Sequence, residues 1–392
     1  MLVGLGGLVT SKGVGMAVPD WPTSYGYNMF LLPIATWRTG GIFDEHTHRL
    51  WASIVGVLVV ALTRWLGGRS ACKPLILCGV VEIVAGLLLL RLGSDWSGAG
   101  HFLIGIGGVV LLAGLVRVNN PRSSGSLPLL GWTAFGLVQL QGLLGGLRVV
   151  LDAHVLADVR MGTAFGVLHG ILGQVFLVVL AIIALRLSRR WVESVRPEPG
   201  RPSSNGMEWL LAGVTLLILI QLLLGAAMRH QHAGLAVPDF PLAHGQLYPS
   251  TAADSIASYN AQRLDARDFN PITPFQIHLH MAHRMVALSL LALVPWAAWR
   301  FRAATRSLAV PGRRLAGWWM ALVVAQAALG IVTVLRNKPA DVATAHVMIG
   351  ALCLAFGAML SLIAREFSIA TENPVMQARA HSQTQPAPRF QS

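Results

Sequence analysis

Nine apolar stretches constrain the fold of this 392-residue chain more than any other feature of its sequence. Each is close to the length of about 17 to 25 residues that a helix needs to cross a lipid bilayer. None shows the alternation of apolar and polar residues that a membrane β-barrel requires, so we predict an all-α polytopic membrane protein. Charged residues make up only 12% of the chain, which excludes an ordinary soluble domain. The predicted spans are Leu50–Leu66, Pro74–Leu92, His101–Val116, Leu127–Leu147, Gly162–Leu185, Met207–Met228, Met281–Trp299, Leu315–Leu335 and Val342–Ile363.

Arginine and lysine gather in every second loop between these stretches, and the longer intervening loops contain few of them. The positive-inside rule therefore places both termini in the cytoplasm and segments 11–44 and 229–276 on the outer side. The membrane that the chain crosses is predicted to be the inner (cytoplasmic) membrane of the cell. The net charge of +13 does not predict nucleic-acid binding, because the basic residues are spread over several loops. The polar tail, residues 366–392, is predicted to be disordered.

The chain contains the same pattern twice. Three motif pairs recur in the same order: GMAVPDWPTSYG (15–26) with GLAVPDFPLAHG (234–245), EHTHR (45–49) with HMAHR (280–284), and QGLLG (141–145) with QAALG (326–330). We predict two tandem four-helix bundles, residues 1–190 and 207–365. Because each half holds an even number of helices, a pseudo-two-fold axis along the membrane normal would relate them.

Two departures from the repeat are visible. The first half has an extra helical hairpin, about residues 74–117, with no counterpart in the second half. Its Glu82, Gly86 and His101 resemble Gln326, Gly330 and His346 in spacing, so we interpret the hairpin as a third, degenerate copy of the unit. The apolar stretch Met1–Thr10 is too short to span a bilayer, and we expect the native first helix to begin further upstream.

Four of the thirteen histidines occupy equivalent places near the outer ends of helices, two in each half. They are His48, His169, His283 and His346. Two imidazoles that face each other across a four-helix bundle are what six-coordinate haem iron needs, and ionisable groups inside a membrane usually mark function. Copper or non-haem iron fits less well, because no matching carboxylate ligands are present. His101 is an additional candidate, whereas His46, His230, His232, His244 and His278 are placed in outer loops with no ligand role.

Glycines are expected to leave room for a flat macrocycle between the helices. We assign this role to Gly145, Gly166, Gly170, Gly330 and Gly350.

Arg49 and Arg284 directly follow two of these histidines. Each could reach the outer surface with its long side chain or pair with a haem propionate, and their repetition favours the second interpretation. Glu45 lies one helical turn before His48, where the second half has His280 instead. Glu45 is either an exposed carboxylate at a helix N-terminus or a catalytic group beside one iron, and the difference between the halves favours catalysis.

Together these motifs resemble the haem A synthase family over about residues 1–365, the extra hairpin excepted. The resemblance implies oxidation of the C8 methyl of haem O to a formyl group, which supplies haem A to terminal cytochrome oxidases. It implies that His283 and His346 bind the iron of a haem b cofactor, that His48 and His169 hold the substrate haem, and that Glu45 is catalytic. Family members of the Gram-positive type carry a cysteine pair in an outer loop, and this sequence has none there.

Two other classes remain open from the residues alone. One is a bis-histidine b-type electron-transfer cytochrome of the membrane, which would hold two permanent haems. The other is a transporter, although transporters tend to have helices broken at mid-membrane. The expected partners are haem O and the bilayer, and haem O synthase, a membrane electron acceptor and a second copy of the chain are further candidates.

Overall fold

The computed structural model describes residues 1–118, 120, 125–156, 159–188, 206–263, 271–306 and 312–372. Each of the nine predicted spans falls on a long helix, which confirms the prediction of an all-α polytopic membrane protein. The long helices are α2 (Ile42–Gly67), α3 (Cys72–Arg91), α4 (Ser97–Leu115), α5 (Leu127–Val150), α6 (Met161–Leu187), α8 (Met207–His230), α10 (Pro274–Ala304), α11 (Gly312–Leu335) and α12 (Ala340–Glu372). Within the described residues, eight helical stretches are apolar and long enough to cross a membrane, and one of them, Ile42–Arg91, contains both α2 and α3.

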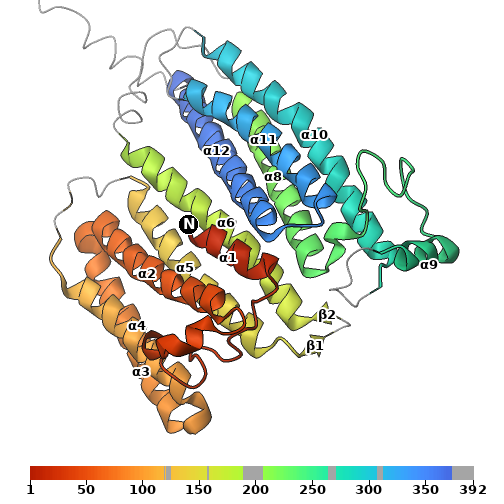
Figure 1. Cartoon of the computed structure of the whole chain (residues 1–392). Helices are drawn as coiled ribbons and strands as arrows, with labels where there is room; N and C mark the ends of the chain where they lie inside the picture. The colour runs from red at the N-terminus through yellow and green to blue at the C-terminus, as the bar shows by residue number, and fades with distance from the viewer. Residues whose placement is uncertain are drawn as a thin grey trace, which may run out of the picture.

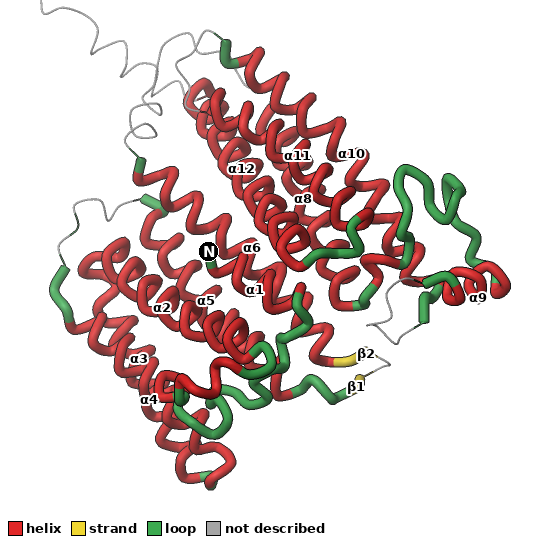
Figure 2. Tube along the Cα trace, viewed as in Figure 1, coloured by secondary structure: helices red, strands yellow, loops and turns green. Residues whose placement is uncertain are grey.

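Short helices and a small hairpin accompany the long helices, together with five 3-10 helical turns in the described residues (Figure 2). Helix α1 (Leu2–Ser11) has 10 residues, and α9 (Ala253–Ala261) lies in the connection between α8 and α10. A small antiparallel hairpin, β1 (Val155–Leu156) and β2 (Val159–Arg160), joins α5 to α6.

Two helices begin well before their apolar stretches. α2 starts at Ile42 and α10 at Pro274, each about two turns earlier than the predicted span. Thr273 starts α10 as a capping box, because its hydroxyl accepts the Gln276 N–H and the Gln276 side chain accepts the Thr273 N–H. The EHTHR and HMAHR motifs therefore lie on helices, which fixes the directions of their side chains.

The C-terminal helix is also longer than expected. α12 continues to Glu372, so residues 366–372 of the predicted disordered tail are helical. Adding residues to an existing helix carries no nucleation penalty, which explains why the helix passes the polar boundary. The rest of the predicted tail, residues 373–392, lies outside the described residues.

The long helices form two groups (Figure 1). The first contains α2, α5 and α6 with the α3–α4 hairpin at its outer edge, and the second contains α8, α10, α11 and α12. Short α1 packs on α2 of its own half and on α12 of the other half, and α6 packs on both α8 and α12. The bounds of the two predicted halves and the symmetry axis between them stay predictions.

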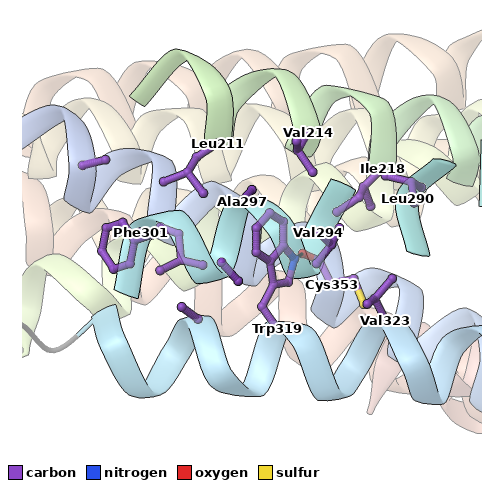
Figure 3. Close-up of a cluster of buried hydrophobic side chains, with 14 of the residues drawn as sticks. Leu211, Val214, Ile218, Leu290, Val294, Ala297, Phe301, Trp319, Val323 and Cys353 are labelled. Carbon is purple, nitrogen blue, oxygen red and sulfur yellow. Dashed lines mark hydrogen bonds between the residues drawn. The ribbon is translucent and has the colours of Figure 1, made fainter. Parts of the chain in front are cut away.

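Each group has a core of buried apolar side chains toward the end expected to face the cytoplasm. In the second group, Leu211, Phe301 and Trp319 are fully buried, and the Trp319 indole N–H donates to the Cys353 carbonyl oxygen at 2.8 Å (Figure 3). Leu211 and Trp319 lie near the starts of α8 and α11, and Phe301 near the end of α10. The four histidines lie toward the opposite ends of their helices, away from this packed region.

Glycines bring the two helices of the extra hairpin into backbone contact. A Cβ added at Gly107 would lie 2.7 Å from the Gly79 carbonyl oxygen, and one added at Gly79 would lie 2.6 Å from the Gly107 carbonyl oxygen. Leu75 and Val110 then pack the hairpin against the core of the first group. The hairpin is therefore a built part of the first half.

Gly107→Ala is expected to lower the apparent Tm of the detergent-solubilised protein by about 5 °C, because its Cβ forces two backbones apart. Gly108→Ala is the matched control, since no atom lies within 4 Å of an added Cβ there. Thermal unfolding followed by tryptophan fluorescence compares the two variants. Equal Tm values would contradict the close packing.

Candidate functional site

The two outer loops have the same local structure, as the repeat predicts. Asp20 accepts the backbone N–H groups of Tyr25 at 2.7 Å and Gly26 at 2.9 Å. Asp239 accepts those of His244 at 2.7 Å and Gly245 at 2.9 Å. The motif pair at residues 15–26 and 234–245 is thus a structural repeat as well as a sequence repeat.

An arginine from the following helix fastens each loop. Arg49 donates to the carbonyl oxygens of Asp20 at 2.6 Å, Thr23 at 3.1 Å and Val18 at 2.7 Å. In the second half, Arg284 donates to three carbonyl oxygens at equivalent places: Leu242 at 2.9 Å, Val237 at 3.0 Å and Asp239 at 2.7 Å. Both guanidinium groups therefore hold loop backbone, and their predicted pairing with haem propionates stays a prediction.

Glu45 is buried at 4% exposure, so its interpretation as an exposed helix-terminal carboxylate is wrong. Its Oε2 accepts the Val18 N–H at 2.9 Å and its Oε1 accepts from Arg49 at 2.7 Å. His280 takes the equivalent place in the second half and is equally buried, at 2% exposure. Glu45 thus joins the helix to the loop within one hydrogen-bonded cluster.

His48 and His169 come together from α2 and α6. Their ring centroids are 6.4 Å apart, with the ring planes at 85°. Two imidazoles that bind one metal ion from opposite sides, through bonds of about 2 Å, have centroids about 6 Å apart. The His169 Nδ1–H donates to the Gln141 carbonyl oxygen at 3.2 Å, and His48 Nδ1 is buried with no partner among the described residues.

His283 and His346 form the second pair, on α10 and α12. The Gln221 amide lies 3.1 Å from His283 Nε2, and the Gln326 amide lies 3.3 Å from His346 Nε2. The His346 Nδ1–H also donates to the Gln326 carbonyl oxygen at 3.1 Å. Each Nε2 accepts from a glutamine amide, so each ring is in the tautomer with its lone pair on Nε2. A metal ion would bind through that same lone pair in place of the amide.

A glycine on a neighbouring helix faces each of the four rings. A Cβ added at the glycine would lie 3.0 to 3.3 Å from Cε1 of the ring. The pairs are Gly6 with His48, Gly145 with His169, Gly225 with His283, and Gly330 with His346. Side chains at these four glycines would press against the imidazoles. Each ring therefore packs closely against a glycine, and we call these four contacts the glycine cradles.

All four histidines line one cavity of about 2720 Å³, which extends through both halves. Glu45, Arg49 and Arg284 line it as well. Among the described residues, no group of three or more His, Cys, Asp or Glu side chains could hold a bare metal ion. Paired imidazoles in glycine cradles beside a large cavity fit an iron porphyrin, whose ring supplies the other four ligands.

Comparison with known proteins places this arrangement in a family. The model of the cytochrome oxidase assembly protein family (COX15-CtaA) matches residues 97–357, from the start of α4 into α12. A haem A synthase from Bradyrhizobium sp. (strain ORS 278) is 32% identical over 274 residues, which cover 68% of this chain and 67% of that protein. One from Bradyrhizobium sp. (strain BTAi1 / ATCC BAA-1182) is 30% identical and covers 79% of this chain and 80% of its own length. The chain belongs to the haem A synthase family.

Several predictions about individual residues need correction. His46, His230 and His278 lie on α2, α8 and α10 and not in outer loops, because these helices extend past the apolar stretches. The hairpin does not repeat the glycine–histidine contact of the two halves, because Gly86 contacts the Gly100 backbone and not His101. His101 is exposed and lines the cavity.

Not every predicted glycine makes room for a macrocycle. A Cβ added at Gly166 would lie 2.5 Å from the His230 ring, and one added at Gly350 would lie 2.9 Å from Leu222. Both glycines therefore permit packing against side chains.

The repeated motifs contained Gln141 and Gln326, but sequence reasoning gave them no role and missed Gln221 and Arg148. All three glutamines stand four residues before a cradle glycine, a QxxxG spacing that could have identified Gln221. Arg148 lines the same cavity and interacts electrostatically with His48 and His169. No hydrogen bond joins its guanidinium to another described residue. A lone arginine at the end of α5 gave no signal in the sequence.

The outer loops should loosen at low pH. Burial alone would raise the pKa of Asp239, but the hydrogen bonds from Gly245 and His244 outweigh it, and the pKa lies below its usual range. A carboxylate with a lowered pKa stabilises the fold above its unfolded pKa of about 3.9, and this stabilisation is lost as the pH falls further. Hydrogen-exchange protection of residues 234–245, corrected for intrinsic rates, should fall between pH 6 and pH 3. Unchanged protection, or wild-type protection in Asp239→Asn at pH 6, would contradict this anchoring role.

Proposed function

We propose that this chain is a haem A synthase, an oxidoreductase that converts the C8 methyl of haem O to a formyl group. Membership of the family supports the general activity. The four histidines that pack against glycines beside the cavity are the observation that supports the two proposed haem sites. The proposal places a haem b cofactor in the second half and the haem O substrate in the first. The product, haem A, would serve the assembly of a terminal oxidase.

The second half suits a resident cofactor. His283 and His346 would bind the haem b iron, and bound haem b would carry electrons away from the substrate. The bond from His346 Nδ1–H to the Gln326 carbonyl oxygen fixes the direction of that ring and leaves Nε2 to face the iron. Iron would take the places that the Gln221 and Gln326 amides occupy at the two Nε2 atoms.

The first half suits a substrate. His48 and His169 would hold the haem O iron between α2 and α6 at the observed ring separation of 6.4 Å. Arg148 is a cation without a hydrogen-bond partner among the described residues and lines the same part of the cavity, so it would pair with a propionate. Arg49 already gives four hydrogen bonds to the loop and to Glu45, which leaves Arg148 better placed for this role.

Glu45 would act on protons in the first half. Its side chain precedes His48 by one helical turn and lines the cavity. Each carboxylate oxygen accepts one hydrogen bond and keeps a second lone pair, so Glu45 can take up a proton while the loop holds it in place. Oxidation of a methyl group releases protons, and a fixed carboxylate beside the ring edge would accept them.

The division of labour between the halves predicts different spectra for different variants. His283→Ala and His346→Ala should remove the b-type absorbance of the purified protein. His169→Ala and Arg148→Gln should keep that absorbance but lose bound haem O when the host also makes haem O. Full b-type absorbance in both second-half variants would overturn the assignment of the cofactor site.

Glu45→Gln should keep haem b and bind haem O but lower the rate of haem A formation at least about a hundredfold, the size expected for loss of an acid–base group. Haems extracted from cells that co-express a haem O synthase measure this. Asp44→Asn is the matched control, because Asp44 is the neighbouring carboxylate and pairs with Lys12 at 2.9 Å. Wild-type conversion by Glu45→Gln would remove its catalytic role, and absence of haem A from the wild type would refute the proposed function.

A further inference from the structure

Three glycines of the first half line the cavity without serving helix packing. They are Gly56 on α2, Gly142 on α5 and Gly170 on α6, and no atom lies within 4 Å of a Cβ added at any of them. Glycine lowers helix stability, and in membrane helices close approach of a neighbour usually explains it. These three glycines have no such neighbour, so they leave open space in the cavity.

The second half fills the equivalent positions. Counted from the matching histidines and glutamines, Gly56 corresponds to Leu291, Gly142 to Ala327 and Gly170 to Val347. All three replacements line the same cavity. The two haem sites thus share their histidines and their cradle glycines but differ in the volume beside the ring.

The extra space lies deeper in the membrane than the histidine pair. α2 and α6 run inward from the outer loops, and Gly56 lies about two turns beyond His48, while Gly170 directly follows His169. α5 runs outward, and Gly142 lies about one turn before Gly145, the cradle of His169. The open positions therefore extend from the level of the histidines toward the centre of the bilayer.

Gln174 adds an unsatisfied polar group to this space. It is only 6% exposed, lines the cavity, and its Oε1 is buried with no hydrogen-bond partner among the described residues. It lies one turn beyond Gly170 on the same face of α6. An unpaired buried amide oxygen is costly, and the second half has Ala351 at the equivalent position. A ligand of the first half that carries a hydroxyl group would satisfy it.

We propose that this region, which we call the tail passage and define as Gly56, Gly142, Gly170 and Gln174, binds the hydroxyethylfarnesyl side chain of haem O. The inference rests on the proposed function and deepens it. Gln174 Oε1 accepts a hydrogen bond from the hydroxyl at the root of the chain, and the glycines admit the isoprenoid carbons that follow. Haem b carries a vinyl group in place of this chain, so the tail passage selects substrate over cofactor.

The extra hairpin contributes to the same region. Gly105 on α4 lines the cavity and also has no atom within 4 Å of an added Cβ. α4 packs on α2, the helix that carries Gly56. The hairpin thus extends the apolar wall along which an isoprenoid chain lies, and the second half has no counterpart for it.

The test introduces second-half residues into the tail passage. Gly170→Val and the triple variant Gly56→Leu, Gly142→Ala, Gly170→Val are purified from cells that co-express a haem O synthase, and bound haems are extracted and quantified. Both should retain at least tenfold less haem O and haem A than the wild type, with unchanged haem b. Gly136→Val is the matched control, because Gly136 on α5 also has open space around it but does not line the cavity. Wild-type haem O content in the triple variant, or equal loss of haem O and haem b, overturns the proposal.

Gln174→Leu keeps the volume and removes the hydrogen bond. It should raise the haem O concentration for half-maximal turnover about tenfold with little change in the maximal rate, the pattern for a group that binds but does not react. Wild-type affinity for haem O would overturn the role of Gln174. A wild-type protein that retains haem O through the tail passage but forms no haem A would refute the proposed function alone, so the two failures are distinguishable.

Discussion

This architecture depends on one kind of contact, in which a histidine ring lies close to a glycine on a neighbouring helix. Four times, a histidine ring lies 3.0 to 3.3 Å from the place where a glycine's Cβ would stand. A side chain at any of these glycines would require its ring to shift by a few tenths of an ångström or more. The cradles keep the rings at a fixed level near the outer ends of the helices, while the opposite ends are closed by packed cores such as that around Trp319.

The outer loops depend on the same helices. Arg49 and Arg284 fasten equivalent loops through carbonyl oxygens, and each follows a cradled histidine directly in the sequence. Hydrogen bonds thus connect each loop to the helix turn that carries the arginine and the imidazole. Glu45 belongs to this connection in the first half only, because the second half has a buried histidine at its place.

Duplication has kept the scaffold and changed what surrounds it. The halves share loops, arginines, histidines and cradle glycines, and they differ at Glu45, in the extra hairpin and in the tail passage. In the proposed function these differences separate a site that performs chemistry on a bulky substrate from a site that holds a smaller cofactor. The difference in volume comes from Leu291, Ala327 and Val347, which stand where the first half has glycines.

The sequence alone determined the class of fold, the spans, the repeat and the four histidines, because apolar length and motif spacing are local properties of the chain. It also indicated Glu45 as the point at which the halves differ. Only the tertiary structure decided that Glu45 is buried, that Arg49 and Arg284 bind loop backbone, and that Gly86 packs on backbone and not on His101. These outcomes depend on which atoms from distant segments meet, and a pattern along one helix carries no information about its neighbours. The open glycines and the unpaired Gln174 amide became visible for the same reason, since empty space is a property of packed helices and not of their sequence.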